Sequence, residues 1–346
     1  GAALRGFTIR NGQGTPFGPN RLGGAILAVG AEATISDCVF LDNEASGAGG
    51  AIGMIGGRMR IERCVFRNNE AGFGDGGGAI WMSGSPGTVI EACSFIANEA
   101  GFFGGAISNV NSSPLIVNCL FTGNEAAQGG AIRNSASSPA VIHCTVAYNT
   151  ADDDFETTGG GMRSSLSSSR PTVRGSIFWR NEPSEVIDLA GAETDVSCSL
   201  VEGWDLAPTL CRINGGDPLF LDPLGLDGKP GTGDENMRLA VHSPAVDRGD
   251  GAAIPDETAT DLDGNPRFVD AIQAPASAIV DLGPYERQNV DPADIDGNGS
   301  IDGEDLFVIL STWGPCQPES PCPGDLNGDG VVDAEDIMQL LGAWMG

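Results

Sequence analysis

A short unit recurs through the first half of the chain and limits the folds that the chain can adopt. The tetrapeptide GGAI begins at residues 23, 49, 77, 104 and 129, and GGGM begins at 159, in steps of 26, 28, 27, 25 and 30 residues. Between the copies lies a second motif, Cys-x-Phe-x-x-Asn-Glu, which is clearest at residues 38–44, 64–70, 93–99 and 119–125. A unit of this length cannot bury its own apolar face, so successive units must stack on one another.

The residue types within the unit predict strands joined by tight corners. Cys and Phe lie two positions apart, which places both side chains on one face of a β-strand. The Asn that follows suits a bend, and Gly-Gly supplies a second corner before Ala-Ile opens the next strand. Stacked coils of this kind predict an all-β solenoid, a right-handed single-stranded parallel β-helix, over residues 1–215.

Equivalent residues of successive coils are expected to form rows along the inside of the solenoid. Small hydrophobic Cys side chains make one row, for which disulfides or a metal between coils are the alternative. Phe side chains make a second row, and Asn side chains are expected to hydrogen-bond one another rather than a ligand. The rows are Cys38, Cys64, Cys93, Cys119 and Cys144; Phe40, Phe66, Phe95 and Phe121; and Asn43, Asn69, Asn98, Asn124 and Asn149.

The alternation of GGAI with Phe-x-x-Asn over residues 23–182 resembles the repeats of the chlamydial polymorphic outer membrane proteins. The resemblance implies an extracellular β-helix, and adhesion is the role that it implies. Those proteins end in a membrane barrel, which these repeats do not resemble. The resemblance therefore favours the fold and a surface setting over adhesion.

The chain carries a formal net charge of −29 at pH 7, which excludes some classes of partner. Nucleic acids and anionic membrane surfaces are bound through Lys and Arg, so neither is expected here. An acidic chain suits divalent cations instead. No apolar stretch approaches the roughly 20 residues of a membrane-spanning helix. The chain starts without Met or a signal sequence, so we expect a trimmed form of an exported protein.

An enzyme is the main alternative to a structural rod, because β-helices can carry carboxylates that act on polysaccharides. The densest group of carboxylates is the run Asp152, Asp153, Asp154 and Glu156. It lies in the longest insertion between coils, where a solvated loop is expected rather than a catalytic pair. His143 follows an inward-facing stretch and is expected to point outward, and His242 stands alone. The sequence leans against an enzyme; a carboxylate pair with a basic residue on one rod face would favour one.

Residues 216–288 are rich in Asp, Pro and Gly, and are expected to close the solenoid. The order of their motifs, from GGDPLF to IVDLGPYE, resembles the closing segment of choice-of-anchor Q proteins. Apolar residues of this segment would plug the open C-terminal end of the solenoid, where strand edges are otherwise unpaired. These residues are Leu219, Phe220, Leu239, Val246 and Leu282.

Two stretches of the closing segment are further candidates for calcium sites. They are 222–236, with Asp227, Asp234, Glu235 and Asn236, and 261–265, with Asp261, Asp263 and Asn265. Both lack a complete ligand pattern, so turn chemistry is the favoured interpretation. Cys198 and Cys211 are expected to pair across the start of the segment, as suits an oxidising exterior.

Two acidic loops of twelve residues, 294–305 and 325–336, lie 31 residues apart. In a calcium loop of this length, oxygen ligands come from positions 1, 3, 5, 7, 9 and 12, and position 6 is Gly. Both loops match every position, so the sequence predicts two Ca²⁺ sites. Their ligands are Asp294, Asp296, Asn298, the carbonyl of Ser300, Asp302 and Asp305, and Asp325, Asn327, Asp329, the carbonyl of Val331, Asp333 and Asp336.

Each loop is followed by apolar residues with the spacing of a short amphipathic helix. These are Leu306, Ile309, Leu310 and Trp313 after the first loop, and Ile337, Leu340, Leu341 and Trp344 after the second. With Asp at position 12 and no helix before either loop, residues 291–346 resemble a type I dockerin. The resemblance implies a small all-α module, placed at 289–346, that folds on binding calcium and docks to a cohesin-like domain.

Two features qualify this resemblance. Partner contacts in that family use loop positions 10 and 11, which here are Gly303, Glu304, Ala334 and Glu335 in place of hydroxyl residues. The expectation of a cohesin partner is weaker for that reason. Between the loops, Cys316 and Cys322 are expected to form a local disulfide, which is typical of extracellular proteins.

The sequence as a whole predicts an exported bacterial β-helix that serves as a structural or adhesive surface component. Its last module would dock in a calcium-dependent way to a cohesin-like domain, a cell-envelope component or another copy of the chain, and docking to another copy would make it a filament subunit. A polysaccharide is the further ligand that we consider. The alternative is a dockerin-bearing polysaccharide lyase or glycoside hydrolase of the β-helix type.

Overall fold

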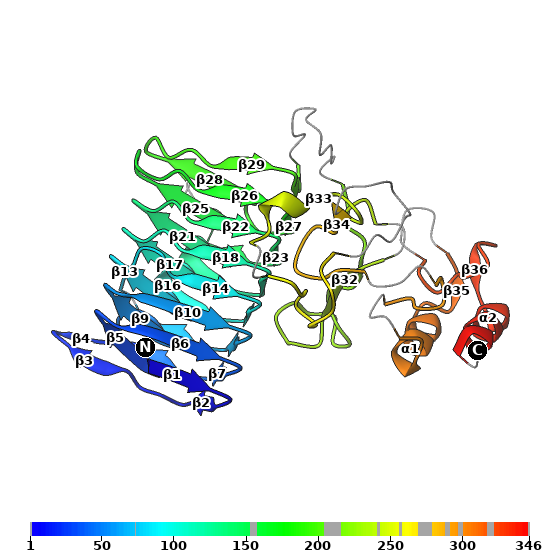
Figure 1. Ribbon diagram of the computed structural model, residues 1–346, viewed down its shortest axis with the longest axis horizontal. Coiled ribbons are helices and arrows are strands. Elements are labelled where there is room, and N and C mark those ends of the chain that lie inside the picture. Colours follow the sequence, from blue (N-terminus) through cyan, green and yellow to red (C-terminus); the bar gives the residue numbers. More distant parts are fainter. Residues whose placement is uncertain are drawn as a thin grey trace.

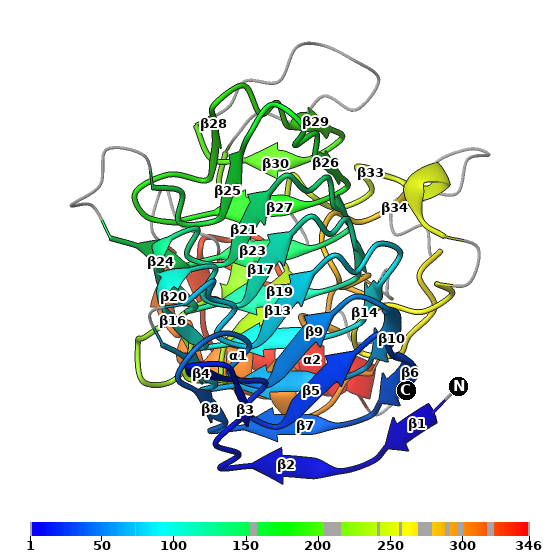
Figure 2. The same cartoon turned by 90° about the vertical axis from the view of Figure 1, so that its left-hand side faces the viewer.

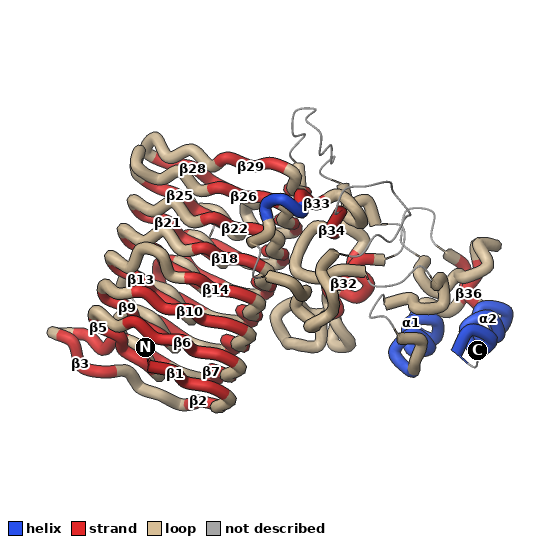
Figure 3. The backbone as a smooth tube through the Cα atoms, in the orientation of Figure 1, coloured by secondary structure: helices blue, strands red, loops and turns tan. Residues whose placement is uncertain are grey.

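The computed structural model describes residues 2–72, 74–152, 158–203, 216–240, 243–255, 258–268, 279–287, 291–296, 300–316 and 322–344. These residues form a rod of stacked coils, a segment along one flank of the rod, and two helices beyond that segment (Figure 1). Figure 3 shows that strands dominate the rod and that the two longer helices lie together at the opposite side of the molecule.

Each coil of the rod contributes a strand to several parallel sheets. The first sheet has eight strands: β1 (Ala2–Arg5), β6 (Glu32–Ser36), β10 (Arg58–Glu62), β14 (Val89–Glu91), β18 (Leu115–Val117), β22 (Ala140–Ile142), β26 (Thr172–Arg174) and β29 (Asp195–Ser197). The second sheet also has eight: β2 (Thr8–Arg10), β7 (Val39–Leu41), β11 (Val65–Arg67), β15 (Ser94–Ile96), β19 (Leu120–Thr122), β23 (Thr145–Ala147), β27 (Ile177–Trp179) and β30 (Leu200–Val201). Equivalent positions of the repeat pair in register from coil to coil.

Two further parallel sheets complete the coils. The third is short, with β8 (Glu44–Ala45), β12 (Glu70–Ala71), β16 (Glu99–Phe103), β20 (Glu125–Gln128) and β24 (Thr150–Ala151). The fourth contains β5 (Ile26–Val29), β9 (Ile52–Ile55), β13 (Ile80–Ser83), β17 (Ile107–Val110), β21 (Ile132–Ser135), β25 (Met162–Ser165) and β28 (Val186–Leu189), stacked in chain order in Figure 2. A hairpin of β3 (Thr15–Phe17) and β4 (Asn20–Leu22) extends the first coil. The parallel β-helix expected from the repeat is confirmed.

The Cys and Phe rows lie inside the rod as the repeat predicts. All five Cys side chains of the row are buried, and their thiols are free, so the row holds no disulfide. Each thiol lies against backbone carbonyls; the Cys93 Sγ, for example, donates to the Glu91 carbonyl at 3.2 Å. The Phe row is a continuous stack with ring centroids 4.7–4.9 Å apart.

The Asn row is a directional ladder of hydrogen bonds. Each Asn Nδ2 donates to the Oδ1 of the next Asn at 2.8–2.9 Å, from Asn43 through to a sixth member, Asn181. Each Oδ1 also accepts the backbone N–H of the preceding Asn, as between Asn69 and Asn98 at 3.1 Å. Each rung directs its backbone N–H and one Nδ2 hydrogen toward the later coil, while Nδ2 also donates to a carbonyl of the earlier coil, as from Asn69 to Phe40 at 3.0 Å. The last rung therefore needs an acceptor.

Glu185 supplies that acceptor. The backbone N–H of Asn181 donates to Glu185 Oε1 at 3.0 Å, and Asn181 Nδ2 donates to Oε2. Burial raises the pKa of Glu185 to about 8, while the bonds from Asn181 lower it and the nearby Glu202 raises it. A buried carboxyl thus ends the ladder.

The free energy of unfolding of the rod is expected to fall as the pH rises from about 4.5 to about 8. Glu185 keeps its proton in the folded rod until its pKa of about 8, whereas an unfolded Glu releases it above about 4.5. The stabilisation is therefore complete below the unfolded pKa and is lost through the folded one, at no more than about 1.4 kcal/mol per pH unit. Urea titrations across this range should show a shallower slope in Glu185→Gln. The exposed Glu193→Gln is the control, and equal slopes in the two variants would contradict the assignment.

The closing segment, residues 216–288, packs along the flank of the rod in its described part. It contains the antiparallel pairs β31 (Phe220–Asp222) with β32 (Asn236–Leu239) and β33 (Gly249–Asp250) with β34 (Ile279–Val280), and the turn η1 (Gly251–Ala253). Its apolar side chains share a core with outward-facing residues of the second sheet. That core contains Leu120, Ala147, Ile177, Trp179 and Leu200 of the rod and Phe220, Met237, Leu239, Ala245, Val246 and Leu282 of the segment.

This position differs from the expected plug at the C-terminal end of the solenoid. The shared core draws on β19, β23, β27 and β30, so the segment lies across four successive coils on the side of the rod (Figure 1). Polar contacts add to it: Asn118 Nδ2 donates to the Thr260 carbonyl at 2.7 Å, and the Gly283 N–H donates to the Gly175 carbonyl at 2.8 Å. The physical reason is that the outward positions of these four strands are mostly apolar, with Thr122 and Thr145 as exceptions, which offers a lateral docking face.

The last part of the chain has the expected pair of helices. Helix α1 (Gly303–Ser311) begins after the N-cap Asp302, and α2 (Ala334–Trp344) begins within the last three residues of the second loop. Two short strands, β35 (Gly314–Pro315) and β36 (Val331–Val332), pair between them. The small core joins residues of both halves: Ile295, Ile309, Val332 and Leu340. Among the described residues, no helix is long and apolar enough to cross a membrane.

Candidate metal centre

The first acidic loop brings three of its predicted ligands together. One carboxylate oxygen from each of Asp294, Asp296 and Asp305 lies within 4.8 Å of the others, and all three side chains are buried. Buried carboxylates repel one another unless a cation or a proton compensates them. A compact set of hard oxygen donors fits Ca²⁺, which takes carboxylates and carbonyls as ligands.

Asp305 holds this loop closed from position 12. Its Oδ1 accepts the N–H groups of Ile295 at 2.7 Å and Asp296 at 3.1 Å, and its Oδ2 accepts the N–H of Asp302 at 2.8 Å. Burial raises the pKa of Asp305, and these backbone bonds lower it. One carboxylate therefore ties the start of the loop to the first turn of α1.

The remaining ligands predicted in the first loop are placed differently. Ser300 is exposed, and its expected contribution is a backbone carbonyl. The carboxylate of Asp302 caps α1 by accepting the N–H of Glu304 at 2.8 Å. Asn298 lies outside the described residues.

The second loop has the same closing contact but a more open arrangement. Asp336 is buried and accepts the N–H groups of Leu326 at 2.8 Å and Asp333 at 2.8 Å, as Asp305 does in the first loop. Asp325 accepts three N–H groups, including that of Gly330 at 2.9 Å. Exposed positions of this loop are Asn327, Asp329 and Val331, and Asp333 is half-buried. The four carboxylates predicted as its ligands do not form a three-member cluster within the described part of the chain.

The cysteines near the loops are not metal ligands. Cys316, Cys322 and Asp325 lie close together, but Cys316 and Cys322 form the predicted disulfide, with Cα atoms 5.6 Å apart. Sulfurs joined in this way offer no thiolate. Cys198 is also disulfide-bonded; Cys211, its expected partner, lies outside the described residues.

The other two acidic stretches use their carboxylates in local contacts. Asp234 accepts the Thr232 hydroxyl at 2.6 Å, and this bond lowers the pKa of Asp234. Asp263 forms an ion pair with Arg238 at 2.8 Å. Asp261 accepts the N–H groups of Asn265 at 2.8 Å and Glu286 at 3.1 Å. These contacts are those of turns and a salt bridge.

His143 points outward from the coil, as predicted, but its ring is not exposed to solvent. The ring lies beneath the closing segment and is fully buried, with Nδ1 3.1 Å from the Asp281 carbonyl and 2.8 Å from Arg267 Nη2. Burial and the charge of Arg267 lower the pKa of His143 to about 3. The ring is therefore uncharged and is packed between the rod and the closing segment. His242, and the acidic run except for Asp152, lie outside the described residues.

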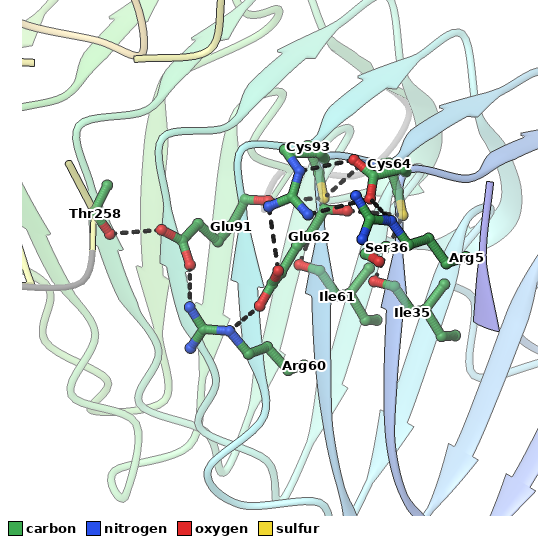
Figure 4. Close-up of polar contacts among 12 residues, drawn as sticks. Arg5, Ile35, Ser36, Arg60, Ile61, Glu62, Cys64, Glu91, Cys93 and Thr258 are labelled. Carbon is green, nitrogen blue, oxygen red and sulfur yellow. Dashed lines mark hydrogen bonds and ion pairs between the residues drawn. The ribbon is translucent and has the colours of Figure 1, made fainter. Parts of the chain in front are cut away.

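Sequence reasoning missed a charged cluster on the first sheet, shown in Figure 4. Arg60 contacts Glu62 of its own strand through Nε and Glu91 of the next coil through Nη2 at 2.5 Å. The Thr258 hydroxyl of the closing segment donates to Glu91 at 2.7 Å. The repeat itself could have identified these carboxylates, because Glu62 and Glu91 both stand two residues before a Cys of the inner row.

This cluster borders a cleft of about 560 Å³ between the rod and the closing segment. Its charged and aromatic lining includes Arg60, Glu62, Arg63, Glu91, Asp261, Asp263 and Tyr285. It has the carboxylate pair and basic residue that would favour an enzyme. Both carboxylates are held by Arg60, however, whereas acid–base chemistry needs a carboxylate free to reach the substrate. The arrangement suits ligand binding or attachment of the closing segment better than bond cleavage.

A family model for a right-handed β-helix region matches residues 4–178 of the chain. No curated protein sequence matches it. The matched range runs from β1 through most of β27, so it covers most of the rod.

Proposed function

Because the chain belongs to the right-handed β-helix family, we propose that its rod is a rigid extracellular scaffold that carries a calcium-dependent docking module at residues 289–346. The observation that carries this proposal is the buried cluster of Asp294, Asp296 and Asp305 in a loop whose pattern recurs 31 residues later. Such a cluster is costly without a cation, and the loop spacing is that of a calcium site. The disulfide between Cys316 and Cys322 supports an oxidising exterior.

Calcium would be held in each loop by the side chains and carbonyls already assigned to it. In the first loop, Asp294, Asp296 and Asp305 would be joined by Asn298, the Ser300 carbonyl and Asp302. In the second loop, the ligands would be Asp325, Asn327, Asp329, the Val331 carbonyl, Asp333 and Asp336. The chemistry that the ion supplies is charge compensation, which lets these acidic loops close over a core of only four buried apolar residues.

The docking surface is the outer face of the two helices. Each helix region exposes three large apolar side chains at equivalent positions: Phe307, Leu310 and Trp313 in the first half, and Met338, Leu341 and Trp344 in the second, with 37–66% of each exposed. Apolar side chains gathered in this way mark an interaction surface on a soluble protein. We take a second copy of the chain as the partner to test first, with a cohesin-like domain or a cell-envelope component as the alternatives.

The docking proposal is tested on the full chain by electron microscopy and sizing chromatography in millimolar calcium and in excess chelator. Ordered assemblies that disperse in chelator are expected. The variant Trp313→Ser with Trp344→Ser should stay dispersed in calcium, and Leu226→Ser, which removes a 76% exposed apolar residue from the closing segment, should assemble normally. A chain that is monomeric under both conditions would refute self-docking and direct the search to the other two partners.

The second candidate function is a polysaccharide lyase or glycoside hydrolase carried on the same docking module. It would rest on Glu62 and Glu91 beside the cleft. Assays of new reducing ends and unsaturated sugars on acidic and neutral polysaccharides test it. Turnover that disappears in Glu62→Gln with Glu91→Gln would establish the enzyme, and absence of turnover in the parent chain would remove this candidate.

A further inference from the structure

Arg287 joins the closing segment to the first acidic loop. The side chain is only 5% exposed. Its Nη2 donates to the carbonyl of Asp294 at 2.9 Å, and its Nη1 lies 3.3 Å from the carbonyl of Ile295 and 3.4 Å from that of Leu239 in β32. One guanidinium thus holds the first two residues of the loop against a strand of the closing segment.

Hydrogen bonds continue from Arg287 to the rod. Its backbone N–H donates to Asp281 Oδ2 at 2.8 Å, and Asp281 Oδ1 accepts the N–H of Asp247 at 2.7 Å. The carbonyl of Asp281 lies 3.1 Å from Nδ1 of His143, which belongs to the rod. The first loop is therefore connected to a coil of the solenoid through an unbroken series of polar contacts.

Arg287 also lies within the electric field of the carboxylate cluster. Burial lowers the pKa of Arg287, and the charges of Asp294, Asp281, Asp296 and Asp305 raise it. The charge of Arg238 also interacts with Asp296, but that guanidinium is engaged by Asp263 at 2.8 Å. The guanidinium reaches the loop through the carbonyls of Asp294 and Ile295, and from there its charge partly offsets the mutual repulsion of the three carboxylates.

The second loop has no arginine at the position equivalent to Arg287, and its predicted ligand side chains are less buried than those of the first loop. The residue 31 positions after Arg287 is Pro318, which carries no charge. Asp325 and Asn327 of the second loop are half-buried and exposed, respectively, whereas their equivalents in the first loop, Asp294 and Asp296, are both buried. The two loops therefore differ in the contacts that stabilise them in the absence of a cation.

We propose that Arg287 is a positioning residue of the first loop, an internal counter-ion that keeps this loop closed without calcium and links calcium binding there to docking of the closing segment on the rod. This inference rests on the proposed calcium function. It predicts two unequal sites, of which the first is preformed and the second is ordered by the ion. Because coupling is reciprocal, a change that loosens the closing segment should also weaken calcium binding at the first loop.

The test is amide hydrogen exchange of the full chain, in chelator and in saturating calcium, for the parent, Arg287→Met and Arg287→Lys. In the parent in chelator, the amides of Ile295, Asp296 and Asp302 should exchange at least about tenfold more slowly than those of Leu326, Asn327 and Asp333. Arg287→Met should abolish that difference in chelator and leave protection nearly normal in calcium. Arg287→Lys, which retains the charge, should recover part of it.

A purely structural role for Arg287 gives a different pattern. Arg267→Met removes another buried arginine of the same segment, one that donates to the carbonyl of Asp281 at 3.0 Å and forms no hydrogen bond with the described residues of the loop. It should loosen the closing segment and, through the coupling, weaken calcium binding at the first loop, but in chelator the amides of Ile295 and Asp296 should stay better protected than those of Leu326 and Asn327. If Arg287→Met kept that difference in chelator as well, the inference would be overturned while the calcium sites stayed in place. A parent chain whose two loops ignore calcium would overturn both the inference and the proposed function.

Discussion

Replacing Phe95 with alanine is expected to lower the free energy of unfolding of the rod by about 3–5 kcal/mol. Phe95 is completely buried, and its ring stacks between those of Phe66 at 4.9 Å and Phe121 at 4.7 Å. The substitution removes apolar burial and two ring contacts, and the parallel coils cannot collapse to fill the space without breaking their register. Urea denaturation followed by circular dichroism measures the loss.

The exposed Phe17→Ala in the first hairpin is the matched control, because its side chain is 49% exposed. It should change stability by less than about 0.5 kcal/mol. In a stack where each coil contacts only its neighbours, the cavity at Phe95 weakens two interfaces and the effect should be strongest in those coils. Similar losses in both variants would mean that the Phe row does not dominate the stability of the rod.

The inside of the rod could be predicted from the sequence because the fold converts repeat position into spatial position. Once residues about 26 positions apart stack in register, every Cys, Phe and Asn of the motif must meet its own equivalent. The rows containing Cys93, Phe95 and Asn98 follow directly. Asn181 continues the ladder for the same reason, and only its terminal acceptor, Glu185, falls outside the periodic pattern.

The outside of the rod could not be predicted in this way. The closing segment docks on Leu120, Ile177 and Leu200, which stand at outward positions that vary from coil to coil. No periodic signal relates them to Phe220 or Leu282, so the sequence indicated that the segment covers the solenoid but placed it at the C-terminal end instead of the flank. The burial of His143 has the same cause, because its outward direction follows from the repeat but its cover comes from residues more than a hundred positions later.

The acidic loops could be predicted from the sequence only in part. Their twelve-residue spacing is local, so the sequence alone identified Asp305 and Asp336 as position 12 of each loop, although it did not predict the backbone N–H groups that they accept. The difference between the loops does not follow from the sequence, because it depends on Arg287 and on how the closing segment lies against the first loop. Local ligand patterns therefore predicted the candidate sites, and tertiary packing decides how far each is preformed.

Asp305→Ala is expected to unfold the first loop and helix α1 while leaving the rod intact. Asp305 is completely buried and accepts the backbone N–H groups of Ile295, Asp296 and Asp302. Removing the acceptor of a buried N–H costs about 1–3 kcal/mol, so the loss of three should exceed what a core of four buried apolar side chains can offset. Hydrogen exchange of residues 303–311 and calcium titration measure it, and the first-loop calcium site should be lost.

The matched control is Glu304→Ala, one position earlier in the same first turn of α1. Glu304 is exposed, so its removal costs only the interaction of its charge with the helix start, about 0.3–1 kcal/mol. Asp336→Ala should reproduce the Asp305 effect in the second loop, because Asp336 makes the same closing contacts there. If Asp305→Ala kept both calcium sites and a protected α1, position 12 would not hold the loop closed, and the metal centre would have to be sought among other ligands. Unfolding confined to this module, with an unchanged rod, would show that the solenoid does not depend on the first loop even though Arg287 connects the two.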